Sequence, residues 1–83
     1  MAETDIAEKC IIITGAFSDP GNVRAMEDRL TYQGYDVYSE SNGNLVRIGL
    51  QFDCEEKDLD NYLVQIRQNV SPNAWYLYPA DYQ

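Results

Sequence analysis

The sequence lacks histidine and is poor in cations and cysteines, and each shortage excludes a class of function. The chain has 83 residues with 6 Lys and Arg against 14 Asp and Glu, a net charge of -8. So few cations cannot neutralise a row of phosphates, which argues against binding to nucleic acid or to anionic membrane surfaces. No apolar run approaches the roughly 20 residues that a membrane helix needs. Residues 1–9 are polar, and we expect a flexible leader there without a signal peptide.

Metal and enzyme chemistry are disfavoured on the same grounds. Without histidine or a CxxC spacing there is no set of zinc ligands, and no nucleophile has a base beside it. The acidic side chains around residue 55 (Asp53, Glu55, Glu56, Asp58 and Asp60) open a helix, and their spacing scatters them over its surface. We therefore expect a non-catalytic domain that needs no cofactor.

The residues that remain predict a small β-α-β-β-α-β domain over residues 10–79, with a tail at 80–83. Residues 10–14 are a β-branched strand, and a Ser-Asp-Pro start predicts a helix from about 20 to 33, ended by Gly34. Strands at 35–39 and 45–49 flank an Asn-Gly hairpin turn. An apolar stripe from Leu59 to Val70 predicts a second helix with a capping-box-like start at Asp53 and Glu56, and 74–78 is the last strand. The fold class is therefore α+β, a four-stranded antiparallel or mixed sheet with two helices on one face.

Alternation along the strands assigns side chains to the two faces of this sheet. Residues expected on the helix side are Ile12, Thr14, Val37, Val46, Ile48, Trp75 and Leu77. Residues expected on the open face are Ile11, Ile13, Asp36, Tyr38, Glu40, Leu45, Arg47, Tyr76 and Tyr78. The open face then has an apolar centre with a tyrosine rim, where sugar rings can stack and Arg47 can pair with a carboxylate. We expect Tyr32 and Tyr62, on the helices, to pack in or beside the core.

Several of these residues resemble the SPOR family of ferredoxin-like domains. The first half resembles it in Gly15-Ala16-Phe17, Ser18-Asp19-Pro20 and Gly34-Tyr35, and the second in residues 45–49, Phe52 and Asn73-Ala74-Trp75. The resemblance covers residues 10–78, with Ile13 where the family often has glutamine and one residue more between Gly49 and Phe52 than is common.

The resemblance implies a bacterial envelope module that binds peptidoglycan glycan strands stripped of stem peptides. It places such a domain in the periplasm or cell envelope, at the septum or other sites of wall remodelling and cell division. The glycan-contacting residues it implies, taken with the open-face assignment, are Ile13, Ser18, Tyr38, Leu45, Arg47 and Tyr76. For Ser18, capping of the first helix is the competing role.

Other functions fit the same architecture. The open face is also suited to a protein partner or a homodimer, because exposed apolar patches often mark interfaces. ACT-like regulatory domains share the plan of four strands and two helices, and their small ligand would lie at residues 19–22.

The two cysteines, Cys10 and Cys54, are expected to be free and mostly buried. This follows if the first and third strands run parallel in the centre of the sheet. The thiols would then lie at opposite ends, roughly 15–20 Å apart at about 3.3 Å per residue, too far for a disulfide.

Overall fold

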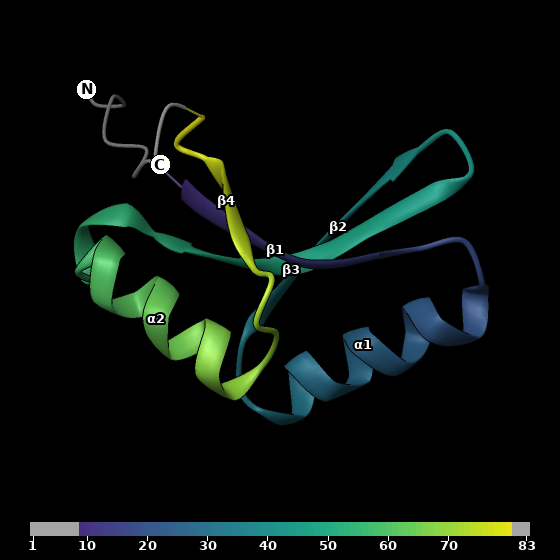
Figure 1. Cartoon of the computed structure of the whole chain (residues 1–83), viewed down its shortest axis with the longest axis horizontal. Helices are drawn as coiled ribbons and strands as arrows, with labels where there is room; N and C mark the ends of the chain where they lie inside the picture. The colour runs from purple at the N-terminus through teal and green to yellow at the C-terminus, as the bar shows by residue number, and fades with distance from the viewer. Residues whose placement is uncertain (1–8, 81–83) are drawn as a thin grey trace, which may run out of the picture.

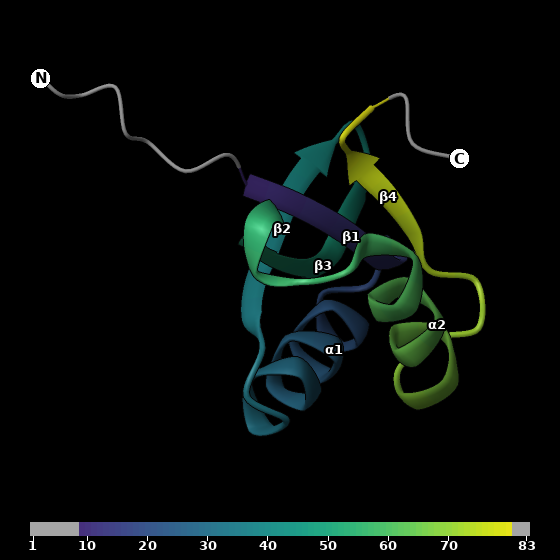
Figure 2. The same ribbon diagram turned by 90° about the vertical axis from the view of Figure 1, so that its left-hand side faces the viewer.

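The structure, a computed structural model, describes residues 9–80. Four strands, β1 (Lys9–Phe17), β2 (Asp36–Asn42), β3 (Leu45–Asp53) and β4 (Trp75–Tyr78), form one antiparallel sheet in the order β2-β3-β1-β4. Helices α1 (Pro20–Tyr32) and α2 (Leu59–Asn69) cover one face of this sheet and leave the other uncovered (Figure 1). Figure 2 shows the same two layers from the side, with both helices below the strands. The predicted α+β class and the β-α-β-β-α-β order are therefore confirmed.

Helix α1 begins and ends where its local signals predict. The carboxylate of Asp19 accepts a hydrogen bond of 2.8 Å from the Gly21 amide, so Asp19 and not Ser18 is the cap. After the helix, Gly34 has a φ of +92°, and the amide of Tyr35 donates to the carbonyl of Leu30 at 3.0 Å. Gly34 thus terminates α1 in the left-handed conformation that glycine adopts at little cost.

Helix α2 begins later than its predicted start at Asp53. A short 3-10 helix at Cys54–Glu56 comes first, and Asp58 caps α2 by accepting from the amides of Asp60 and Asn61. The helix then packs its apolar stripe on the sheet as predicted, with Leu63 and Ile66 in the core. Two residues of the acidic run thus have different roles, because Asp58 caps α2 while Asp53 forms an ion pair with Lys9 of β1 at 3.0 Å.

The cysteine prediction is wrong, because β1 and β3 run antiparallel. Cys10, at the start of β1, is opposite Phe52, near the end of β3. Cys54 therefore lies beside Cys10, with a Cα–Cα distance of 5.1 Å, and the two form a disulfide. All neighbouring strands in this sheet are antiparallel, so the end of β3 lies beside the start of β1.

The hydrophobic core lies between the helices and one face of the sheet. Ile12 and Ile48, predicted on this face, are fully buried there, and Val37 and Val46 pack against them. Tyr76 also belongs to this core, although it was predicted on the open face. Its ring lies beside Phe52, and its hydroxyl donates to the carbonyl of Leu59 at 2.9 Å. The polar tip of a tyrosine can be satisfied in a core in this way, so its hydroxyl does not place it on the surface.

Two further predictions concern the ends of the elements. Lys9, predicted in the leader, is the first residue of β1, and the rest of the predicted leader lies outside the described residues, as do residues 81–83 of the predicted tail. Tyr32 was expected to pack in or beside the core, but it is 92% exposed at the end of α1. Tyr62 does pack as predicted, edge-on against Phe52 at 4.7 Å between ring centroids.

Candidate functional site

The candidate site is the uncovered face of the sheet, which we call the open face. Cross-strand pairing puts Tyr38 opposite Gly49, Glu40 opposite Arg47, and Ile13 opposite both Gly49 and Trp75. Ile11 and Ile13 take no part in the core cluster, which fits their predicted place on this face. The residues that line the middle of the open face thus come from all four strands.

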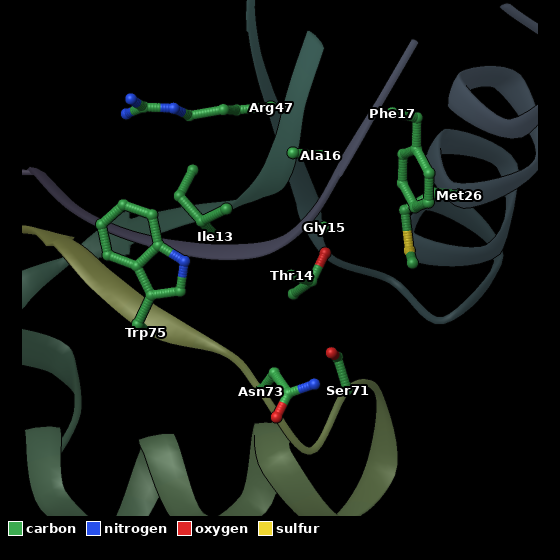
Figure 3. Close-up of a pocket in the computed structure, with 10 residues that line it drawn as sticks. All are labelled: Ile13, Thr14, Gly15, Ala16, Phe17, Met26, Arg47, Ser71, Asn73 and Trp75. Atoms are coloured by element: carbon green, nitrogen blue, oxygen red, sulfur yellow. The ribbon is translucent and has the colours of Figure 1, made fainter. Parts of the chain in front are cut away.

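Trp75 is the residue on this face that the sequence assignment missed. It was predicted on the helix side, but it is 43% exposed, and its ring faces the Arg47 guanidinium at 5.8 Å (Figure 3). The pairing of β1 with β4 is irregular between Ile11 and Ile12, so that Tyr78 pairs with Ile11 and Trp75 with Ile13. Both aromatic residues consequently reach the open face, although they are three residues apart.

The isoleucines of this face are covered by their neighbours. Ile13 is only 2% exposed and Ile11 only 7%. In Figure 3 the side chain of Ile13 lies between Arg47 and Trp75. The apolar centre expected of this face is therefore the floor of the site, and the aromatic and charged side chains around it form the accessible surface.

A polar network orders the middle of the face. The Tyr38 hydroxyl donates to Oε1 of Glu40 at 2.6 Å, while Oε2 of the same carboxylate lies 4.0 Å from Nη1 of Arg47. The hydrogen bond to Glu40 raises the pKa of the Tyr38 phenol above its ordinary value, with burial adding to the effect. Glu40 thus interacts with both the Tyr38 phenol and the Arg47 guanidinium, and Arg47 in turn faces Trp75.

Gly49 allows β1 and β3 to approach each other closely in the centre of this face. A Cβ atom added to it would lie 1.9 Å from the carbonyl oxygen of Ile12 and 2.8 Å from the Cα of Ile13. No side chain fits there without moving β1. The backbone of Gly49 accordingly lies between Tyr38 and Ile13, its partners on β2 and β1.

A cleft of about 460 Å³ adjoins the open face at Trp75. Figure 3 shows Trp75, Ile13 and Arg47 on one side of it and Phe17 and Met26 on the other. Its remaining lining comes from the end of β1 and from the loop between α2 and β4, and consists of Thr14, Gly15, Ala16, Ser71 and Asn73.

The predicted site residues are only partly brought together. Ile13, Tyr38 and Arg47 lie side by side in the middle of the open face. Leu45, on the same strand as Arg47, is 46% exposed beside the hairpin turn. Ser18 lines a separate recess against α1, and Tyr76 points into the core.

Residues that the sequence assignment missed are Trp75, Ser71 and Asn73. One signal for Trp75 was available, because Ala74 is small and apolar and would alternate with Tyr76 on the buried side. Both residues are indeed in the core. Ser71 and Asn73 carry no such signal, since they lie in a loop whose path depends on the packing of α2.

The described helices are all too short and too polar to cross a membrane. No protein-family model and no curated protein matches the sequence. Among solved structures, the fold is similar to that of the peptidoglycan-binding domain of the B. subtilis cell wall lytic enzyme CwlC. The two superpose with a TM-score of 0.63 over 92% of this chain and 95% of that domain, at 14% sequence identity. The architecture, a four-stranded sheet with two helices on one face, is thus shared with that domain.

Proposed function

We propose that this protein is a non-catalytic peptidoglycan-binding module that recognises bare glycan strands through its open face. The observation that carries the proposal is the arrangement around Ile13, where Trp75 on β4 and Tyr38 on β2 lie on either side of an apolar floor. Arg47 lies on β3 between them, and Glu40 pairs with it from β2. Sugar rings have an apolar face that stacks on aromatic rings, and their hydroxyls need donors and acceptors nearby. This face offers both, because the aromatic rings lie on its two edge strands and Arg47 lies on β3 between them.

The shared fold supports the same ligand class. The similar solved domain binds peptidoglycan, and it belongs to a lytic enzyme. By that likeness and by the SPOR-like motifs, the present chain would direct a partner domain or protein to the wall, at sites of remodelling or division where stem peptides have been removed.

The disulfide supports a location in the periplasm or cell envelope. The Cys10–Cys54 bond joins residues 44 positions apart, and Cys10 is completely buried. Structural disulfides persist in oxidising compartments and are rare in the cytosol. A peptidoglycan ligand and a structural disulfide therefore point to the same side of the membrane.

Dimerisation through the open face is less well supported by the geometry. That alternative depended on exposed isoleucines, but Ile11 and Ile13 are already covered by side chains of their own chain. The ACT-like alternative gains no specific observation, because the Asp19 carboxylate at residues 19–22 is engaged in capping α1.

The proposed function is tested by sedimentation with cell-wall sacculi. We expect the protein to co-sediment more strongly with sacculi whose stem peptides an amidase has removed than with intact sacculi. Equal binding to both would contradict the preference for bare glycan, and absence of binding to either would contradict peptidoglycan binding itself.

A further inference from the structure

One side of the cleft beside Trp75 is formed by the unpaired edge of β1. Strand β4 pairs with β1 only over Ile11–Ile13, whereas β3 pairs with β1 over its whole length. From Thr14 to Phe17, β1 therefore has β3 on one side and the cleft on the other. A strand edge presents N–H and C=O groups in alternation, and an amide-bearing ligand can satisfy them as another strand would.

The other walls of the cleft suit a small group with one polar end and one apolar end. Ser71 and Asn73 supply a hydroxyl and an amide from the α2–β4 loop, and Asn73 is exposed. Phe17 and Met26 supply an apolar surface opposite (Figure 3). An acetamido group has this composition, since it carries one donor, one acceptor and a methyl group.

The charges of the open face disfavour an anionic ligand group. Within residues 9–80, the cations on this face are Lys9 and Arg47, and each has a carboxylate beside it, Asp53 at 3.0 Å and Glu40 at 4.0 Å. A ligand carboxylate that approached Arg47 would share the guanidinium with Glu40, and repulsion between the two carboxylates would offset part of the attraction. Asp36 adds a further carboxylate to the same face.

We propose that the cleft binds the acetamido group of an N-acetylhexosamine whose ring stacks on Trp75, and that recognition does not use the lactyl carboxylate of muramic acid. This inference rests on the proposed function and narrows it. The ligand class becomes a β-1,4-linked N-acetylhexosamine strand read through its neutral groups. Bare peptidoglycan glycan is one member of that class, and a chitin-type oligosaccharide is another.

The test is calorimetric titration of the 83-residue protein with soluble oligosaccharides of matched length. Bare peptidoglycan glycan carries both acetamido and lactyl groups, chitopentaose carries only acetamido groups, and cellopentaose has a hydroxyl in place of each. We expect chitopentaose to bind within about threefold of the bare glycan. Cellopentaose should bind at least roughly tenfold more weakly, because it leaves the amide partners in the cleft unmatched.

The outcomes separate this inference from the proposed function. If the bare glycan binds and chitopentaose does not, the lactyl carboxylate is recognised and the inference is overturned while the proposed function stands. Equal binding of cellopentaose and chitopentaose would also overturn it, because the acetamido group would then contribute nothing. If none of the ligands binds, the proposed function itself fails.

Two variants locate the effect. Asn73→Ala, at an exposed loop position, should lower the affinity for chitopentaose by roughly threefold to tenfold. Tyr32→Ala, at the exposed end of α1, should leave this affinity unchanged. Arg47→Gln should change the affinities for bare glycan and chitopentaose by the same factor. A loss confined to the bare glycan would show that Arg47 pairs with the lactyl carboxylate and would overturn the inference.

Discussion

The guanidinium of Arg47 lies 5.8 Å from the centre of the Trp75 ring, across the buried side chain of Ile13. This pair links β3 to β4 across β1, the strand between them. A cation near an aromatic face is attracted to it by about 0.5–1 kcal/mol at a partly exposed site. The interaction therefore orients both side chains for a ligand, and neither Arg47 nor Trp75 belongs to the core cluster.

Replacing Trp75 is expected to remove most of the binding. Trp75→Ala should weaken the affinity for bare glycan roughly tenfold to a hundredfold, because a central aromatic residue commonly carries much of an interface's energy. The unfolding midpoint should fall only modestly, because the ring covers Ile13 but takes no part in the core cluster between the helices and the sheet. Fluorescence or calorimetric titration measures the affinity, and Tyr32→Ala is the matched control. Unchanged binding by Trp75→Ala would place the site elsewhere.

Gly49 is expected to be intolerant of any side chain. Gly49→Ala brings a Cβ to within 1.9 Å of the Ile12 carbonyl oxygen, so β1 and β3 must separate. We expect a loss of about 2 kcal/mol or more in the free energy of unfolding. Urea denaturation measures it. Gly21→Ala is the control, because a Cβ there meets only the Asp19 side chain and should cost less than about 1 kcal/mol. A stable Gly49→Ala domain would contradict the close approach.

Reduction of the disulfide is expected to destabilise the domain without abolishing the architecture of the site. Closing a loop of 44 residues lowers the entropy of the unfolded chain enough to contribute about 4 kcal/mol at 25 °C. Denaturation of the oxidised protein and of the Cys10→Ala/Cys54→Ala double variant measures the difference. A thiol assay under denaturing conditions should find neither Cys10 nor Cys54 free, and two free thiols would contradict the disulfide.

Stability should fall at alkaline pH because of Tyr76. Burial raises the pKa of its phenol from 10.0 to about 12. A raised pKa in the folded state means that the stability is fully present below pH 10 and is lost as the pH rises from 10 towards 12. Urea denaturation across this range measures the decline. Tyr76→Phe should have a free energy of unfolding about 1 kcal/mol lower at neutral pH, because it lacks the hydrogen bond to the Leu59 carbonyl. Its stability should also decline less steeply as the pH rises. An equally steep decline in both proteins would contradict the assignment.

Local signals in the sequence were enough to predict the order of the elements. The Asp-Pro start and Gly34 bound α1, the Asn-Gly turn joins β2 to β3, and a single apolar stripe orients α2. These features depend on neighbouring residues, which is why sequence patterns report them reliably. The relative direction of β1 and β3 depends on the path of the chain through residues 18–44, which include α1 and β2, and the disulfide was mispredicted for that reason.

The candidate site was less predictable than the fold. Tyr38, Arg47 and Ile13 follow strict alternation and lie where it puts them. The residue types of Trp75 and Tyr76 do not indicate which face of the sheet each side chain occupies, since both have an apolar body and a polar tip. Tyr78 lies on the open face as predicted, but the irregular β1–β4 pairing puts Trp75 on that face as well, so strict alternation cannot place both residues correctly.

The most direct test of the central claim is an NMR titration of the 15N-labelled protein with soluble bare peptidoglycan glycan. The account predicts that the perturbed amides cluster on the open face and its adjoining cleft, around Ile13, Tyr38, Arg47, Asn73 and Trp75, with the Trp75 indole among the largest shifts. Perturbations confined to α1 and α2, or no perturbation at all, would contradict it.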